Sequence, residues 1–327
     1  MSLDADHIVD RRRMRRKLTF WRVLTVLIAV IAVVGLTALL TRGGPGLASG
    51  PGAGIARVNI EGLIRANQQR SEAFARLANS SVKAVIIHIN SPGGTVAGSE
   101  QLYDSLMLLK AKKPVVVVVD GLAASGGYIA AMASDYIVAQ QTSLVGSIGV
   151  IFQFPNFGEL LKTVGVKVEE VKSSPLKAAP NGYEPTSPEA RAALEALVAD
   201  SYAWFKGMVR DRRKLDGAAL DQVADGRVFT GRQALPLKLI DEIGNEQTAV
   251  DWLVKQKGIA PNTPVRDYRL TPRFGDLPFL HVAVAGALDA AGLTSFARRI
   301  EDWGTFQAVE RLNLDGLLAL WHPQVTN

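Results

Sequence analysis

The chain has 327 residues, of which 48% are hydrophobic and 21% are charged, which suits a globular protein with one sizeable core. The absence of cysteine excludes disulfide bonds and thiolate metal sites. The net charge of +6 comes mainly from residues 1–22, which hold seven Lys or Arg and three Asp, so the pattern argues against a nucleic-acid-binding protein.

The first predicted element is the apolar segment Val23–Thr41, nineteen residues without a charge. At about 1.5 Å per helical residue it spans roughly 28 Å, close to the hydrocarbon thickness of a bilayer. We predict an uncleaved transmembrane anchor, in preference to a buried helix or to a signal sequence cleaved near Ser49. Since the basic residues 1–22 precede this segment, the positive-inside rule predicts a cytoplasmic N-terminus and a translocated remainder of the chain.

Residues 42–54 are rich in glycine and predict a flexible linker before the folded domain. Apolar runs rich in β-branched residues then predict strands at Ile55–Ile60, Val82–Ile89 and Val115–Val119. Leucines at helical spacing predict a helix over Gly98–Lys110, between the second and third strands. This alternation indicates an α/β fold whose sheet is buried on both faces.

A long helix is predicted to begin at Ser187, because a capping hydroxyl is followed there by proline at the first helical position. We expect it to end in the basic cluster Arg210–Lys214. Its predicted apolar stripe consists of Leu194, Leu197, Val198, Tyr202, Phe205 and Val209. Beyond Pro264 the pattern weakens and predicts no defined element.

Two glycine-rich loops follow predicted strands and carry the candidate chemistry. The first, Asn90–Thr95, reads NSPGGT, and the second, Asp120–Tyr128, reads DGLAASGGY. In the second, Ser125 lies among small residues at a strand-to-helix junction, where a tight turn would expose its hydroxyl. The N–H groups of Gly126 and Gly94 could donate to an oxyanion. The pattern favours a serine nucleophile, and a glycine-rich structural turn is the alternative.

A serine nucleophile needs a general base, and the four histidines are weak candidates. His7 lies on the predicted cytoplasmic side, and His281 and His322 lie in the weakly patterned tail. His88 is inside a predicted strand, where packing against the sheet is the simpler interpretation. His88 nevertheless remains open as a base.

Lysine is the next candidate, since a buried lysine whose pKa is lowered toward neutrality can deprotonate serine. The segment Val171–Pro180 contains two lysines. Lys172 continues the alternating stretch Val166–Val171 and is expected to face solvent, whereas Lys177 lies in a loop among small residues. From the residues alone, Lys177 ranks only slightly above Lys172.

In this order, the motifs resemble those of the bacterial signal peptide peptidase A family, in its short, single-repeat form. The resemblance extends from about Ile55 to Gly258, nearly two thirds of the chain. The matching segments are Asn90–Gly94, Ala124–Tyr128, Gly146–Val150, Asp225–Gly231 and Leu239–Gly244.

The resemblance implies a Ser–Lys dyad, with Ser125 as the nucleophile. It also implies Lys177 rather than Lys172 as the general base, because Ser173–Lys177 matches the family pattern S-G-x-x-K apart from Ser174 in place of glycine. The implied fold is an α/β fold with a repeated ββα core, shared by Clp protease and crotonase, and the implied oxyanion donors are Gly94 and Gly126. The residues expected in the substrate groove are Gly93, Gly146, Ser147 and Ile148.

These inferences predict a membrane-anchored serine endopeptidase that degrades hydrophobic peptides, chiefly signal peptides already released from preproteins, without cofactor or metal. The resemblance further implies a ring-shaped homo-oligomer in which the serine and lysine of one site come from neighbouring subunits. We expect the protein in the bacterial cytoplasmic membrane, crossing it once, with its catalytic domain on the extracytoplasmic side.

The predicted organisation has a short tail, an anchor and a linker before the catalytic part. Its boundaries are 1–22 for the basic tail, 23–41 for the anchor, 42–54 for the linker, 55–258 for the peptidase domain and 259–327 for an extension of unassigned role. Two alternatives remain: a crotonase-like acyl-CoA enzyme, which also uses glycine loops as an oxyanion hole, and a catalytically silent membrane scaffold. Binding of coenzyme A would identify an acyl-CoA enzyme. Failure of a serine-directed probe to label Ser125 would indicate a silent scaffold.

Overall fold

The computed structural model describes Trp21, residues 54–270 and residues 318–320. The chain divides into two compact units, Met1–Gly52 and Ala53–Asn327, and of the first unit only Trp21 is described. Apart from Trp21 in the basic tail and residue 54 of the linker, the predicted tail, anchor and linker therefore lie outside the described residues. Among the helices that are described, none combines the length and apolar character needed to cross a bilayer.

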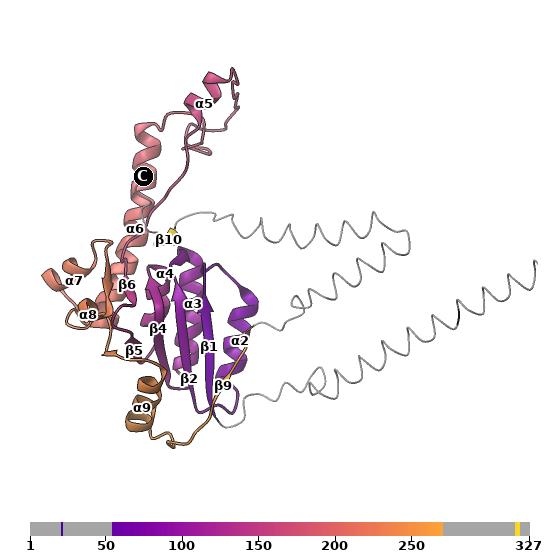
Figure 1. Cartoon of the computed structure of the whole chain (residues 1–327). Helices are drawn as coiled ribbons and strands as arrows, with labels where there is room; N and C mark the ends of the chain where they lie inside the picture. The colour runs from indigo at the N-terminus through magenta and orange to yellow at the C-terminus, as the bar shows by residue number, and fades with distance from the viewer. Residues whose placement is uncertain (1–20, 22–53, 271–317, 321–327) are drawn as a thin grey trace, which may run out of the picture. The chain divides into compact units, whose positions relative to one another are not determined.

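An eight-stranded sheet forms the centre of the second unit (Figure 1). Its main path runs β7 (Val228–Thr230), β6 (Leu144–Gly146), β4 (Val115–Ala124), β2 (Ala84–Ser91), β1 (Ile55–Glu61) and β9 (Val265–Asp267). In addition, β5 (Tyr136–Ala139) pairs with β4, and β8 (Glu242–Ile243) pairs with β5. Every pairing is parallel except that of β6 with β7. The three predicted strands are confirmed, as expected for apolar runs buried in a parallel sheet.

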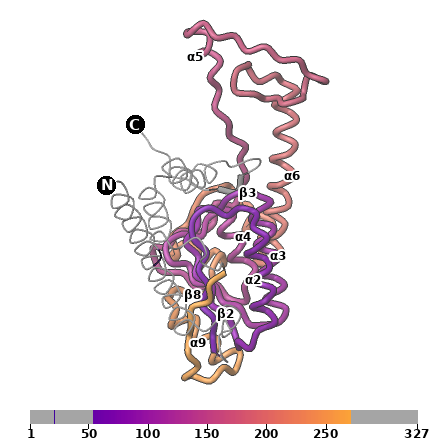
Figure 2. The backbone as a smooth tube through the Cα atoms, turned by 90° about the vertical axis from the view of Figure 1, so that its right-hand side faces the viewer, coloured from indigo at the N-terminus to yellow at the C-terminus, as the bar shows by residue number. Residues whose placement is uncertain are grey.

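Helices cover both faces of this sheet (Figure 2). One face packs against α2 (Gln68–Ala78), α3 (Val96–Lys110), α4 (Gly126–Met132) and part of α6 (Pro188–Arg213), and the other against α9 (Glu246–Lys257). The two-residue period of β4 divides its valines between the two cores: Val115, Val117 and Val119 enter the first, and Val116 and Val118 the second.

β4 continues past the predicted end at Val119 because it changes partner along its length. Its first half pairs with β5, and residues 122–124 pair with β6. This extension carries the strand up to the residue before Ser125.

The predicted helix after β2 is also confirmed, and it begins at Val96 because the Thr95 hydroxyl accepts the Gly98 N–H at 3.1 Å.

A second, two-stranded sheet joins segments that lie far apart in the sequence. In it β3 (Gly93–Thr95) pairs antiparallel with β10 (Leu318–Leu320), and Ala319 lies opposite Gly94. Both β9 and β10 fall within residues 259–327, so parts of that segment belong to the folded unit. The remaining short helices are α5 (Gly158–Thr163), α7 (Gly217–Val223) and α8 (Gly231–Ala234).

Helix α6 begins where predicted, with the Ser187 hydroxyl accepting the Ala190 N–H at 3.1 Å. The predicted apolar stripe is only partly right. Phe205 and Val209 are buried, whereas Leu197 is 53% exposed. The reason is that the first half of α6 extends beyond the sheet, with α5 near its outer end (Figure 1).

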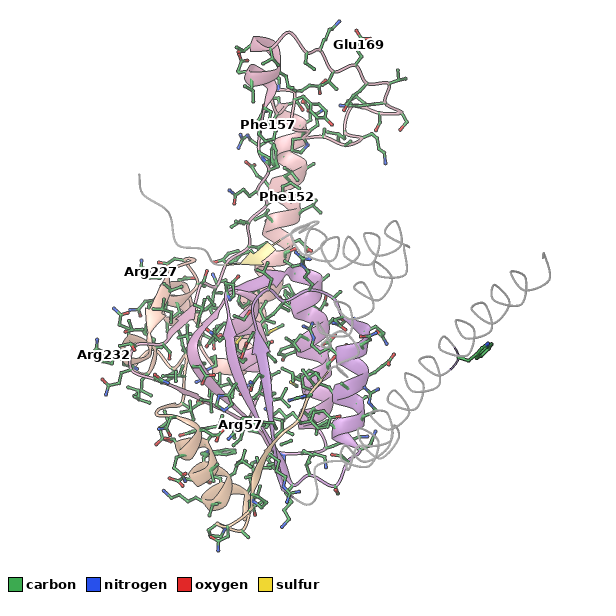
Figure 3. The ribbon with its side chains drawn as sticks, turned by 45° about the vertical axis from the view of Figure 1, so that its right-hand side comes forward. Arg57, Phe152, Phe157, Glu169, Arg227 and Arg232 are labelled. Carbon is green, nitrogen blue, oxygen red and sulfur yellow. The ribbon has the colours of Figure 1, made fainter. Side chains whose placement is uncertain are left out.

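Residues 151–187 form a segment, here called the arm, that connects to the outer part of α6 (Figure 1). Its exposed apolar side chains are Ile151, Phe157, Leu160, Val164, Val166, Val168, Val171, Leu176 and Tyr183. Figure 3 shows Phe157 and Glu169 on this arm, well away from Arg57 in the sheet. Exposed apolar surface on this scale is typical of an interaction surface.

Candidate active site

Ser125 forms the turn between β4 and α4, as predicted. β4 ends at Ala124 and α4 begins at Gly126, and Ser125 adopts φ 53° and ψ −115° between them. A side chain at positive φ is strained, so the surrounding contacts must maintain the turn. The Ser125 N–H donates to the Gly146 carbonyl at 2.8 Å, and the Ser125 carbonyl accepts the Tyr128 N–H at 2.9 Å. A strained strand-to-helix turn of this kind presents the serine nucleophile of α/β-hydrolases.

The segment that begins at Gly146 lies beside this turn, as the predicted groove requires. The Ser125 hydroxyl lies 3.5 Å from the Gly149 carbonyl, and Ser125 is only 1% exposed. Ser147 has φ 51°, and its N–H donates to the Arg227 carbonyl at 2.8 Å. Gly146 therefore supports the backbone of Ser125, while Ser147 and Ile148 line the adjacent cavity.

The first glycine loop presents the Gly94 N–H to one side of β3. Ile64 donates its N–H to the Gly93 carbonyl at 2.8 Å, and its carbonyl accepts the Thr95 N–H at 3.0 Å. Backbone groups of successive strand residues point to opposite sides, so the N–H of Gly94 points away from Ile64, toward the side where β10 pairs. A Cβ at Gly94 would lie 1.7 Å from the Ile64 carbonyl oxygen, so glycine is required here.

Helix α4 presents Gly126 directly after Ser125, at its first position. N–H groups in the first turn of a helix have no acceptor within the helix, so that of Gly126 is available to a ligand. The two predicted oxyanion donors thus come from β3 and from the start of α4, elements that contact each other.

The structure does not bring Lys177 to Ser125 within one chain. Lys177 is exposed on the arm, in a shallow pocket shared with Glu170, Lys172 and Ser173. Within the part of the chain that the structure describes, its ammonium has neither a hydrogen bond nor an ion pair. The fold of a single chain therefore does not place the Lys177 ammonium next to the Ser125 hydroxyl.

The prediction that Lys172 faces solvent is only partly right, because two carboxylates flank its ammonium. Its side chain is 19% exposed and makes ion pairs with Glu170 and, at 3.4 Å, with Glu184. The hydrogen bond with Glu170 raises the pKa of Lys172. Because the ammonium form is stabilised, Lys172 is unsuited to act as a base.

His88 is held by two carboxylates and does not approach Ser125. Its Nδ1 lies 2.9 Å from the Asp120 carboxylate and its Nε2 lies 2.8 Å from the Glu246 carboxylate. Arg57 (Figure 3) donates to the same Glu246 carboxylate at 2.6 Å. With both ring nitrogens occupied, His88 has a structural role that joins β2, β4 and α9.

Glu246 is expected to make the stability of this network depend on pH. Hydrogen bonding to Arg57 and then to His88 lowers the pKa of Glu246. Because the folded-state pKa lies below the unfolded value, this stabilisation is present above about pH 4.5 and is lost as pH falls through the folded-state pKa. We expect Glu246→Gln to lower the free energy of unfolding at pH 7 by about 1–2 kcal/mol. The difference from wild type should shrink at pH 3.

Denaturant unfolding of the full chain at the two pH values measures this effect. Glu100→Gln, at an exposed position of α3, is the matched control and should unfold like wild type at both. An equal loss of stability at pH 7 and pH 3 would contradict the assignment, since a neutral Glu246 would then contribute as much as an ionised one.

A cavity of about 660 Å³ opens beside the segment that follows Gly146. It is formed by residues 147–154, the outer half of α6 and residues 224–226, and Gly149 both lines it and approaches the Ser125 hydroxyl. Its apolar lining includes Ile148, Val150, Ile151, Phe152, Leu194 and Val198. The contribution of α6 was not predicted, because no local pattern reveals which strand-end loop a helix will face.

Comparisons with known proteins relate this chain to peptidases. Residues 107–260 match the family described as "Peptidase family S49", and residues 66–144 match "Clp protease". "Putative protease slr0021" of Synechocystis is 36% identical over 210 residues, which cover 64% of this chain and 76% of that protein. "Protease 4" of Haemophilus influenzae is 33% identical over 225 residues, 65% of this chain and 36% of that protein.

A further relative is "Putative signal peptide peptidase SppA" of Enterococcus faecium, 33% identical over 188 residues. These cover 57% of this chain and 55% of that protein. The chain thus spans about half of this relative and about a third of Protease 4.

Proposed function

Because the chain belongs to peptidase family S49, and is a serine peptidase with the α/β fold of Clp protease, we propose that Ser125 is its nucleophile and that Lys177 of a second copy is its general base. The observation that carries the proposal is the turn at Ser125. It holds a serine at positive φ between a strand and a helix N-terminus, next to a second glycine loop.

A second copy is proposed as the source of the lysine for two reasons. Lys177 lies on the arm and makes no contact with Ser125 in its own chain. The arm also exposes an apolar surface that association with another copy would bury. Burial disfavours the charged form of a lysine, so assembly would activate the base at the moment the site forms. A ring-shaped homo-oligomer provides such a head-to-tail contact at every subunit.

In the proposed mechanism, neutral Lys177 accepts the proton of the Ser125 hydroxyl as the oxygen attacks the scissile carbonyl carbon. The N–H groups of Gly94 and Gly126 donate to the oxyanion of the tetrahedral intermediate. As the intermediate collapses, the C–N bond breaks and Lys177 returns the proton to the leaving amine. Water, deprotonated by Lys177, then hydrolyses the acyl-enzyme and regenerates Ser125.

The substrate is proposed to bind as an extended strand along β3. The pairing of β10 with β3 supports this, since it demonstrates that the edge faced by the Gly94 N–H accepts an antiparallel strand. The apolar cavity beside Ser125 suits hydrophobic side chains. We therefore propose hydrophobic peptides as substrates, chiefly signal peptides released from preproteins, in line with the name of the Enterococcus relative.

The apolar segment 23–41 is proposed to anchor the protein in the bacterial cytoplasmic membrane, with the peptidase domain, residues 55–258, on the extracytoplasmic side. An anchored site would lie close to peptides that remain in the lipid after release.

Degradation of a synthetic signal peptide by the full chain in detergent tests the substrate class. We expect cleavage within the hydrophobic region, detected by mass spectrometry, and little cleavage of a polar peptide of equal length. Equal cleavage of both peptides would refute the preference for hydrophobic substrates.

Removal of residues 318–327 is expected to lower the KM for a peptide substrate severalfold and to leave kcat unchanged. The physical reason is that β10 occupies the edge of β3 that the substrate needs, so the two compete for it. Steady-state kinetics on the truncated chain measure the change. Removal of residues 321–327 alone, which retains β10, is the control, and an equal fall in KM there would contradict the competition.

A further inference from the structure

Ser91 lies in the first glycine loop, NSPGGT, and is 0% exposed. Its hydroxyl donates to the Gly62 carbonyl at 2.7 Å and accepts the Gly93 N–H at 3.1 Å. A hydroxyl can donate and accept at once, and here both capacities are used. The side chain thus connects the residue after β1 to the first residue of β3.

This connection controls the orientation of the Gly94 N–H. Gly62 and Gly93 both have positive φ, at 68° and 102°, and glycine backbones rotate readily. The Ser91 hydroxyl restrains both of them, while the Gly93 carbonyl accepts the Ile64 N–H. Together these bonds orient the peptide between Gly93 and Gly94, and with it the predicted oxyanion donor.

The backbone of Ser91 also contacts the loop of the nucleophile. A Cβ at Gly127 would lie 2.7 Å from the Ser91 carbonyl oxygen and 3.4 Å from the Ser91 Cβ. Ser91 is the register partner of Ala123 in β4, beyond an irregularity that follows Ile89. One residue therefore packs against the start of α4, next to Gly126, and restrains the strand that carries Gly94.

We propose that Ser91 is a positioning residue that sets the separation and direction of the two oxyanion donors, without touching the substrate. The inference rests on the proposed role of Gly94 and Gly126 as those donors. Loss of the hydroxyl would leave the substrate strand and the cavity intact but would misplace the Gly94 N–H. Stabilisation of the transition state would then fall more than binding of the substrate.

The test compares Ser91→Ala with Ser143→Ala in the full chain in detergent. Ser143 is also buried, and its hydroxyl approaches the carbonyls of Val119 and Asp120 at 3.0 and 2.9 Å, so it matches Ser91 in burial and number of contacts. For Ser91→Ala we expect kcat to fall by about 10- to 100-fold, less than the loss of a whole oxyanion donor, with KM nearly unchanged. A peptide aldehyde, whose adduct with Ser125 carries the oxyanion, should bind more weakly by a similar factor.

Ser143→Ala should lose about as much thermal stability as Ser91→Ala, but it should retain the kcat and the aldehyde affinity of wild type. Ser91→Thr, which keeps the hydroxyl, should recover most of kcat, and Ser91→Cys, which keeps only a weak donor, should be intermediate if Ser91→Ala does not fold. Equal kcat in Ser91→Ala and Ser143→Ala, or a loss confined to KM, would overturn the inference while leaving the proposed function intact. A wild type no more active than Ser125→Ala would overturn both.

Discussion

Ser125→Ala is expected to lower kcat for peptide hydrolysis by about 10⁴-fold or more, because no other group replaces the attacking oxygen. The fold should be nearly unaffected. The Ser125 side chain makes no capping hydrogen bond to α4, and its hydrogen bond to the Gly149 carbonyl is long at 3.5 Å. Steady-state kinetics measure the first expectation and denaturant unfolding the second.

Covalent labelling gives an independent measure of the same assignment. A fluorophosphonate probe should modify wild type at Ser125, as located by peptide mapping, and should not modify Ser125→Ala. Ser99→Ala, at a buried serine whose hydroxyl bonds to the Thr95 carbonyl within α3, should be labelled like wild type. Labelling at a different serine would refute the assignment of Ser125 as the nucleophile. If folded wild type is not labelled at all, the result would favour the alternative of a catalytically silent scaffold.

Lys177→Ala is expected to abolish activity to nearly the same extent, whereas Lys172→Ala should remain active. The ion pairs of Lys172 keep it protonated and bound to carboxylates, while the ammonium of Lys177 is free of such partners among the described residues. The comparison is a matched one, because both lysines lie in the same pocket of the arm. Full activity of Lys177→Ala would refute the assignment of Lys177 as the general base.

Mixing the two inactive variants tests whether the dyad forms between copies. If a site takes Ser125 from one subunit and Lys177 from its neighbour, then rings reassembled from equal amounts of Ser125→Ala and Lys177→Ala contain intact sites at about one quarter of their interfaces. Activity should therefore recover to roughly that fraction of wild type after the mixture is dissociated and reassociated. Recovery of none would show that both residues of a site belong to one chain.

The sequence predicted the parts of the molecule that depend on neighbours in the chain. The valines of Val115–Val119 predicted a buried strand, Ser187 predicted the start of a long helix, and the glycines around Ser125 predicted the turn that the structure contains. Gly94 was predicted for its permissive backbone, and the structure adds that the Ile64 carbonyl leaves no room for a Cβ there.

The tertiary structure decided features that depend on residues far apart in sequence. It determined that His88 is bound by Asp120 and Glu246, that Lys172 is paired with Glu184, and that Phe205 and Val209 of α6 are buried while Leu197 is exposed. It also assembled the cavity from three separate segments and joined β10 to β3. Hydrophobic periods and capping signals are local and survive in the sequence, whereas side-chain pairing and cavities arise only when distant segments pack together. For that reason the sequence by itself determined the turn at Ser125 and the strands that support it, whereas the tertiary structure decided where the arm places Lys177 relative to Ser125.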